Sequence, residues 1–306
     1  MAEPAPPEII ELAQRRAEAR GAKDFAAADT LRDAIAAAGW QVVDEPRGWK
    51  LVPTPEPEPA ATGPLLAADV PSVLEIPATA DVSVHWVVEG WPEDVVRGIA
   101  SFRAHQGGRD VHHVVADITG ADPGSFGPNV EVVSLRPDTG WGAASNAGLK
   151  RANGAAVFVM DGSIEAAGDV FGPLEAALSD PGVGLAGPFG IVTHDLRQFE
   201  DAPGPGDCDA VEGYLMAMRR EVLTSAGLFD EKFRWYRTAD IEFSFRVKDR
   251  GLRTVVVPVP VTRHSHRMWF ETEPANRAKW SKRNFYRFLD RWRDRWDLVL
   301  EPEPPE

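Results

Sequence analysis

Three aspartates and a histidine in this 306-residue chain stand where an apolar run ends or a helix begins. Asp117 and Asp161 follow apolar runs, Asp240 opens a helical segment, and His264 follows a run rich in Val and Pro. A carboxylate can take up a proton as a general base, and its oxygens suit hard divalent cations. Imidazole is a common metal ligand. These residue types therefore indicate acid–base chemistry beside a cation site.

The segments that must position these side chains alternate between strands and helices from residue 81 onward. Such alternation predicts a mostly parallel α/β sheet with helices on both faces. Ligands of open sheets of this kind bind beyond the carboxyl ends of the strands, which is where the candidate residues lie. The predicted strands are 82–88, 112–116, 130–135, 155–160, 213–218 and 254–262, and the predicted helices include 92–105 and 143–152.

A separate small module is predicted before the sheet. Residues 8–38 show helical periodicity, with Gly21 ending one helix and Asp24 able to cap a second. Residues 40–52 read as a β-hairpin. The predicted domains are this module at 1–53, a Pro/Ala/Glu-rich linker at 54–79, an α/β domain at 80–268, and a basic aromatic helix with an acidic tail at 269–306.

Composition limits the classes of function. The net charge of −14 argues against general nucleic-acid binding. One cysteine excludes an intrachain disulfide and a cysteine-based zinc site. No apolar run is long enough to span a membrane, and no secretion signal is visible at the N-terminus. We therefore expect a cytoplasmic protein.

The basic segment 274–296 has a helical period, with an aromatic stripe flanked by arginines. This profile favours a helix packed on the α/β domain. The alternative is peripheral contact of this helix with an anionic membrane surface.

The order of motifs between Asp209 and His266 is the most specific signal in the chain. An apolar strand led by Gly213 is followed by a helix, the run GLFDE, an acidic cluster at Asp240, and the late HSH. This order resembles the acceptor half of family 2 glycosyltransferases, which are inverting enzymes with the GT-A fold. The resemblance implies a nucleotide-sugar donor, a glycan or lipid-linked acceptor, and a role in cell-wall or polysaccharide biosynthesis. Rhamnosyltransferases are the most similar subgroup by pattern.

The resemblance also assigns donor-binding residues. The strand ending at Asp117 carries the family's base-contacting motif, and a Gly-rich segment lines the sugar-nucleotide cleft. Glycine lets backbone N–H groups approach a diphosphate closely. The positions that match these two motifs are Asp117, Asp122, Asp138, Gly140, Asn146 and Gly148.

A divalent cation, Mg²⁺ or Mn²⁺, is implied by the family's Asp-x-Asp motif and a late histidine. The motif falls on Asp161-Gly162-Ser163, so Ser163 replaces the usual second carboxylate. His264 is the best match to the late histidine and His266 the second. Metal binding is therefore assigned to Asp161 and His264.

The catalytic base of the family comes from a Glu-Asp pair, which falls here on Ala239-Asp240. Asp240 is the predicted base, with Gly213 and Trp235 expected on the acceptor side. Asp161 and Asp240 can also be read as simple turn or helix caps. Because Ser163 and Ala239 each remove an expected acid, the alternative function is a catalytically degenerate GT-A protein that binds a nucleotide, a glycan or a protein.

The N-terminal run RAEARGAKDFAAADTLRDAIAAAGWQVVDEPRGWKLV resembles the small C-terminal helical module of cysteinyl-tRNA synthetase. No synthetase catalytic or zinc motif accompanies it, so the resemblance implies no aminoacylation. We expect a docking or stabilising module. Contact with tRNA is the alternative, which the acidic balance weakens.

Overall fold

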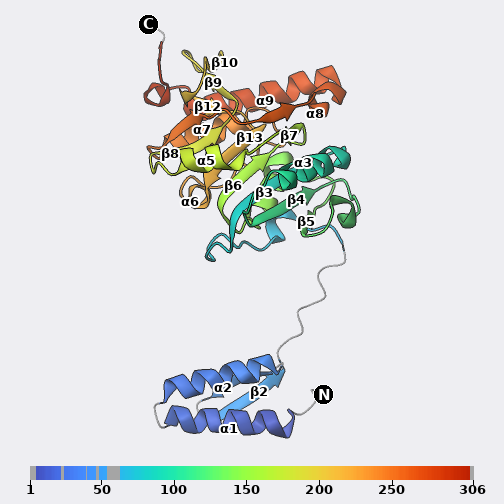
Figure 1. The fold of residues 1–306 in the computed structure, drawn as a ribbon, viewed down its shortest axis with the longest axis vertical. Coiled ribbons are helices and arrows are strands. Elements are labelled where there is room, and N and C mark those ends of the chain that lie inside the picture. The colour runs from blue at the N-terminus through green and yellow to red at the C-terminus, as the bar shows by residue number, and fades with distance from the viewer. Residues whose placement is uncertain (1–4, 22–23, 39, 46–47, 54–62, 304–306) are drawn as a thin grey trace. The chain divides into compact units, whose positions relative to one another are not determined.

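The computed structural model describes residues 5–21, 24–38, 40–45, 48–53 and 63–303. The chain divides into two compact units, residues 1–62 and 63–306, shown in Figure 1. Each has its own core.

The small unit consists of two helices and one hairpin. Helix α1 (Pro7–Gly21) is followed by α2 (Phe25–Ala37), and β1 (Trp40–Glu45) pairs antiparallel with β2 (Gly48–Pro53). The Asp24 carboxylate accepts from the Ala27 amide at 3.1 Å and so caps α2. The core of the unit consists of Ile9, Ala13 and Ile35, with the hairpin residues Trp40, Val42, Trp49 and Leu51 packed against them. The predicted helix pair and hairpin are confirmed.

The large unit is built on an eight-stranded sheet. Four neighbouring pairs are parallel (β3 with β4, β3 with β6, β4 with β5, β14 with β8), and β11 and β13 run antiparallel to their neighbours. The predicted mostly parallel α/β sheet is confirmed. The order across the sheet is β11 (Gly206–Cys208), β14 (Arg253–Val256), β8 (Val183–Gly187), β13 (Leu215–Arg219), β6 (Gly154–Met160), β3 (Ala80–Val88), β4 (Val111–Asp117) and β5 (Val130–Ser134).

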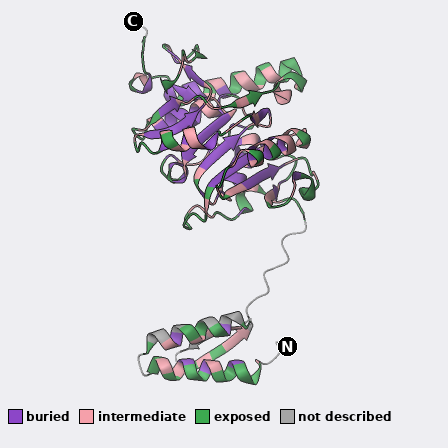
Figure 2. Ribbon diagram, viewed as in Figure 1, coloured by how far each residue is buried: buried purple, intermediate pink, exposed green. Residues whose placement is uncertain are grey.

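Helices cover both faces of this sheet. Helices α3 (Pro92–Ala104) and α5 (Phe171–Leu178) pack on the face that carries Val84 and Trp86. Helices α4 (Trp141–Leu149), α6 (Arg220–Ser225) and α7 (Ala239–Lys248) pack on the opposite face. Side chains of a strand alternate between faces, so each central strand is buried on both sides. Figure 2 shows these strands as buried.

The prediction of a single strand over residues 254–262 is wrong. It divides into β14 and β15 (Val261–Arg263), and β15 pairs with β7 (Ile164–Ala166) in a separate two-stranded sheet. Pro258 and Pro260 lie between the two strands and have no N–H to donate to a ladder. The break carries the chain across to β7. The segment after β15 therefore lies beside the turn that follows β6.

The C-terminal segment packs on the large unit. Helix α8 (Arg267–Glu271) leads into α9 (Pro274–Trp292), which buries Phe288, Leu289 and Trp292 in a cluster with Phe245 of α7. The favoured prediction of packing is confirmed. In the described part of the chain, no helix combines the length and apolarity that crossing a membrane requires.

Residues 63–79, which the composition assigns to the linker, lie on the large unit. The Leu65 amide donates to the Ser134 carbonyl at 2.8 Å, and Val70 is buried. The Arg220 guanidinium donates to the Ile76 carbonyl at 2.6 Å.

The remaining elements are the small sheet β9 (Gly190–Val192), β10 (Glu200–Asp201) and β12 (Ala210–Val211), and the 3₁₀ turns η1 (Ala67–Asp69), η2 (Pro123–Phe126) and η3 (Trp296–Leu298).

Candidate functional site

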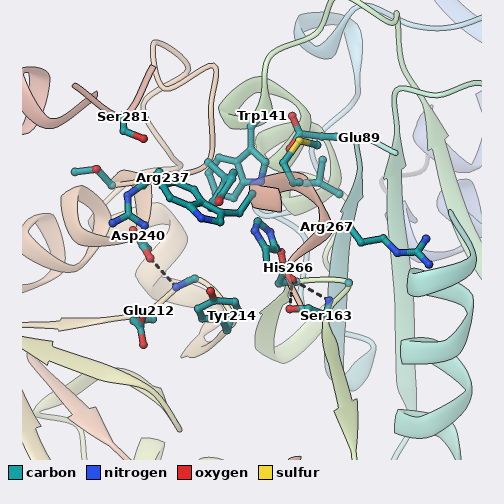
Figure 3. Close-up of a pocket in the computed structure, with 18 of the residues that line it drawn as sticks. Glu89, Trp141, Ser163, Glu212, Tyr214, Arg237, Asp240, His266, Arg267 and Ser281 are labelled. Carbon is teal, nitrogen blue, oxygen red and sulfur yellow. Dashed lines mark hydrogen bonds and ion pairs between the residues drawn. The ribbon is translucent and has the colours of Figure 1, made fainter. Parts of the chain in front are cut away.

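A cavity of about 1100 Å³ opens at the carboxyl ends of β3 and β6 (Figure 3). It is lined by the turn 161–163 after β6, the turn 212–214 between β12 and β13, the start of α7, and the segment 263–270. A second cavity of about 580 Å³ has Glu89 and Met268 in common with the first, so the two adjoin. The larger of these two cavities lies beyond the strand ends, where the sequence predicts the site.

Asp161 is the most constrained carboxylate of the cavity. The Ser163 amide donates to its Oδ1 at 2.8 Å, and the Ser163 hydroxyl donates to the same oxygen. His266 Nε2 lies 2.9 Å from its Oδ2. Burial alone raises the pKa of Asp161, but the hydrogen bonds and charge of His266 and the bonds from Ser163 outweigh it and hold that pKa below its usual value. Asp161 is therefore ionised at neutral pH.

The imidazole beside Asp161 is that of His266, and His264 points elsewhere. His264 Nε2 lies 2.6 Å from Glu165 Oε1, and its side chain is 42% exposed. The pairing of β15 with β7 accounts for this, because Thr262 stands opposite Glu165 and His264 follows at the strand end. The residue beside Asp161 is thus His266, the second match to the late-histidine motif, and the first match, His264, pairs with Glu165 instead.

Asp161 and His266 are the candidate ligands of a cation. In the described ranges, no group of three or more His, Cys, Asp or Glu side chains is placed to hold a metal ion. The Oδ2 and Nε2 atoms are nevertheless close enough to be neighbouring ligands of one ion, and His266 Nδ1 is buried without a hydrogen-bond partner. Mg²⁺ commonly takes one or two protein carboxylates and completes its shell with substrate phosphates and water. One carboxylate and one imidazole fit a cation of that kind.

Asp240 ties the start of α7 to the neighbouring turn. The Gly213 amide donates to Asp240 Oδ2 at 2.8 Å, and the Ile241 amide donates to Oδ1 at 2.9 Å. Burial raises the pKa of Asp240 above its usual value, against the lowering effect of the two amide bonds. Each oxygen accepts one amide and can accept a further hydrogen bond, and Asp240 lines the cavity. Asp240 is placed to accept a further hydrogen bond from a ligand.

Two more carboxyl groups line the cavity, and the sequence motifs assign a role to neither of them. Burial and then the nearby Asp240 charge raise the pKa of Glu212 to about 7. Burial and then the Asp161 charge raise the pKa of Glu89 to about 8. Each interrupts or ends an apolar run, which is the signal that could have found them. Groups with perturbed pKa values in a cavity are typical of functional sites.

Cationic side chains also face the cavity. Arg197, Arg237, Arg263 and Lys282 line it, and none of them forms an ion pair with a carboxylate in the described residues. Arg237 lies over the Trp269 ring at 4.8 Å, and Arg263 over the Tyr214 ring at 4.0 Å. Unpaired cations held by aromatic rings suit an anionic ligand.

The predicted donor residues divide into those that line a cavity and those that do not. Asp117 is fully buried. Its carboxylate accepts hydrogen bonds from the Thr119 amide and hydroxyl and from the Ala121 amide. Asp122 caps η2 through the Gly124 amide. Both residues stabilise the loop after β4 and line neither cavity.

Asn146 likewise lies outside both cavities, donating from Nδ2 to the Phe229 carbonyl at 2.9 Å. Asp138, Gly140 and Trp235 line the second cavity, and Gly213 lines the first. The close approach at Gly140 is to Arg234, since a Cβ there would come within 2.8 Å of its Cγ. The Gly-rich segment therefore packs against the 228–235 loop as well as bordering the second cavity.

Gly148 is a packing position under the sheet. A Cβ at this site would overlap the buried His85 imidazole, whose pKa burial lowers to about 4. We predict that Gly148→Ala lowers the free energy of unfolding by about 1–3 kcal/mol, as overpacking of a core does. Urea denaturation measures the loss, with Gly108→Ala as control because a Cβ at Gly108 meets no atom within 4 Å. Unchanged stability with weaker nucleotide binding would instead support a donor-contact role for Gly148.

Comparison with known proteins finds a family model that resembles part of the chain. The model of the glycosyltransferase-like family 2 matches residues 198–284. The structure of GalNAc-T7 with UDP, GalNAc and Mn²⁺ aligns with 71% of this chain and 50% of that chain, at a TM-score of 0.55 and 17% identity. The mannosyltransferase of Pyrobaculum calidifontis, with GDP-Man and Mn²⁺, aligns with 66% of this chain and 62% of that chain, at a TM-score of 0.47 and 19% identity. The predicted GT-A fold and the resemblance to family 2 are confirmed.

A stretch of 48 residues is 52% identical to the cysteine–tRNA ligase of Opitutus terrae. It makes up 16% of this chain and 10% of that ligase. The chain thus spans about a tenth of the ligase and half of the GalNAc-T7 chain.

Proposed function

We propose that this chain, which has the GT-A fold of glycosyltransferases, transfers a sugar from a nucleotide-sugar donor to a hydroxyl of a glycan or lipid-linked acceptor, with inversion at the anomeric carbon. One observation carries the proposal. Asp161 with His266, and Asp240 with Gly213, face the same cavity from separate elements. That arrangement provides a site for the diphosphate and a site for the acceptor hydroxyl within one enclosure.

On the donor side, the diphosphate would lie against Arg237 and Lys282, whose charges are not neutralised by carboxylates in the described part of the chain. Asp161 and His266 would hold a divalent cation on the same diphosphate. When bound, such a cation stabilises the negative charge that develops on the leaving group. Arg237 and Lys282 would stabilise the same negative charge from positions fixed by the protein.

On the acceptor side, Asp240 accepts the proton of the attacking hydroxyl. The acceptor oxygen forms a bond to the anomeric carbon as the bond from that carbon to the diphosphate oxygen breaks. The bonding electrons leave with the diphosphate, and the proton remains on the carboxylate. Amide bonds from Gly213 and Ile241 hold that carboxylate at the cavity wall, so little motion precedes the transfer.

Transfer is tested with a panel of UDP-, GDP- and dTDP-sugars, each with Mg²⁺ or Mn²⁺, by measuring release of the nucleoside diphosphate. Release above the rate in buffer, increased by an acceptor, is the expected result. Absence of release from every donor would contradict the proposal. Rhamnosyl donors belong in the panel because the motif order is most similar to rhamnosyltransferases.

Replacement of Asp161 by Asn is predicted to remove the metal dependence of nucleotide binding. In the wild type, UDP or GDP at a hundred times its Kd raises stability by about 2.7 kcal/mol. We expect this rise to need Mn²⁺ in the wild type and to be equal with Mn²⁺ and with EDTA in the variant. Thermal shift measures it, with Asp81→Asn, an exposed aspartate outside both cavities, as control. A wild-type shift that is unaffected by EDTA would remove Asp161 and His266 from this role.

The alternative function is a degenerate GT-A protein that binds without transfer, and Ser163 in the place of a carboxylate favours it. The same titration distinguishes the two. A metal-dependent nucleotide shift supports the enzyme, while no shift with any nucleotide or metal supports a module that binds a glycan or a protein.

A role in cell-wall or polysaccharide synthesis, at the cytoplasmic side of a membrane, accompanies the proposal. The exposed basic residues Lys279 and Arg283 on α9 are the surface proposed to contact anionic lipid. The small N-terminal unit is proposed to dock or stabilise rather than to bind tRNA, since the chain is strongly acidic.

A further inference from the structure

Glu212 lies in the wall of the larger cavity, next to Asp240. Figure 3 shows the Glu212 and Asp240 side chains on the same side of the cavity. The Val211 amide donates to Ser244 Oγ at 3.2 Å, and the Gly213 amide donates to Asp240 Oδ2 at 2.8 Å. Asp240 and Ser244 are one turn apart on α7, so the segment 211–213 runs along that helix. These two hydrogen bonds to α7 hold Glu212 beside Asp240.

The Glu212 carboxyl has no protein partner. Within the described residues, no backbone or side-chain group donates a hydrogen bond to it or forms an ion pair with it. The charged groups that act on it are Asp240 of α7, Arg263 of β15, Asp201 of β10, and Arg237 before α7. Burial, and then the charge of Asp240, raise its pKa to about 7. The group is therefore divided between its protonated and ionised forms at neutral pH.

Asp240 differs from Glu212 in its surroundings. Both of its oxygens accept backbone amides, which favour the ionised form and fix the carboxylate in place. The neighbouring Ala239 has its methyl group in the hydrophobic core, at 1% exposure. The second acid beside Asp240 is therefore contributed by residue 212 from another element, and not by residue 239 from the same helix.

We propose that Glu212 and Asp240 act as one acid–base pair that takes up the proton of the acceptor hydroxyl. This inference rests on the proposed glycosyl transfer. The O–H bond of the acceptor breaks, and its proton passes to a carboxylate oxygen of the pair. The acceptor oxygen bonds to the anomeric carbon, and the diphosphate departs with the electrons of its bond. Asp240 receives the proton, and the ionised form of Glu212 beside it makes Asp240 the stronger base.

The pairing has a definite pH signature. Two carboxylates in a desolvated site repel one another, so the pair loses its protons in two separate steps. A base must be ionised to act, so kcat rises with pH through the upper step, near 7. Removal of either carboxyl lowers the pKa of the other. In Glu212→Gln the rise therefore moves to lower pH, and the plateau value of kcat falls by on the order of 10²-fold.

The kinetic experiment measures kcat against pH for the wild type, Glu212→Gln, Glu212→Asp and Glu200→Gln. Glu200 is exposed on β10 and does not line the cavity, so it is the matched control and keeps the wild-type profile. Glu212→Asp keeps the carboxyl and is expected to recover part of the lost rate. A wild-type rate and an unshifted profile in Glu212→Gln would overturn the pairing while leaving glycosyl transfer intact.

A second measurement does not depend on turnover. Carboxyl ¹³C NMR of protein labelled at Glu follows Glu212 directly, with its signal assigned by its disappearance in Glu212→Gln. The pairing predicts a titration near pH 7 that moves to lower pH in Asp240→Asn. Titration near the ordinary Glu value in the wild type, or no shift in Asp240→Asn, would refute the pair. A confirmed pair in a protein that turns over no donor would instead refute the proposed function alone.

Discussion

Replacement of Asp240 by Asn is expected to lower kcat for glycosyl transfer by about 10²–10⁴-fold, the usual contribution of a general base. Asn has the shape of Asp but cannot take up a proton from the acceptor hydroxyl. Its side-chain oxygen can accept only one of the two amides that Asp240 binds, from Gly213 and Ile241. Nucleotide binding should change little, since Asp161 and His266, which would hold the cation of the diphosphate, pair with one another and not with Asp240.

The measurement is steady-state kinetics with the best donor and acceptor, together with a thermal shift with the nucleoside diphosphate. Glu200→Gln is the control for loss of one acidic side chain near the cavity. A kcat within a few-fold of the wild type, with nucleotide binding intact, would exclude Asp240 as the base.

Replacement of Glu242 by Ala is expected to lower the free energy of unfolding by about 3–5 kcal/mol, the effect of removing one partner of a buried ion pair. The Glu242 side chain is 2% exposed, and its two oxygens accept from Arg246 at 2.9 Å and Arg291 at 2.9 Å. Arg246 also donates to the carbonyls of Ala226 and Leu228. Loss of Glu242 leaves a buried guanidinium without its counter-ion, and it releases α9 from α7.

Urea denaturation of Glu242→Ala and of Asp290→Ala compares the two kinds of ion pair. Asp290 pairs with Arg293 on the surface, so its loss should cost about 1 kcal/mol or less. If the two variants were equally stable, the buried network would not be what holds α9 in place. A larger loss of stability in Glu242→Ala than in Asp290→Ala would show that Glu242, two residues after Asp240, is a structural residue.

The sheet could be predicted from the sequence because each central strand is a short apolar run with turn residues on both sides. The last strand was predicted wrongly, because the Val/Pro run 254–262 has a strand composition but contains Pro258 and Pro260, which cannot continue a ladder. The break brings His266 to Asp161 and leaves His264 with Glu165. Which histidine meets Asp161 depends on strand pairing, and single-residue motifs do not encode it.

The site could be predicted only in part from the sequence, again because local motifs do not encode contacts between distant segments. Asp161 and Asp240 carry local signals, since one ends a strand and the other begins a helix. Asp117 carries the same local signal, yet its carboxylate is used entirely by the Thr119 and Ala121 amides and the Thr119 hydroxyl. Glu212 has no motif, because its place beside Asp240 comes from the packing of β12 on α7. Long-range packing determines which acids share a cavity.

The central claim, transfer with inversion at the cavity of Asp161 and Asp240, is tested most directly by ¹H NMR of the anomeric protons. The nucleotide-sugar panel is incubated with the wild type and with Asp240→Asn, and the spectra are followed over time. The account predicts a new anomeric signal of the configuration opposite to that of the donor in the wild type, formed at least about 10²-fold more slowly in the variant. No new anomeric signal from any donor, or a product with the configuration of the donor, would contradict it.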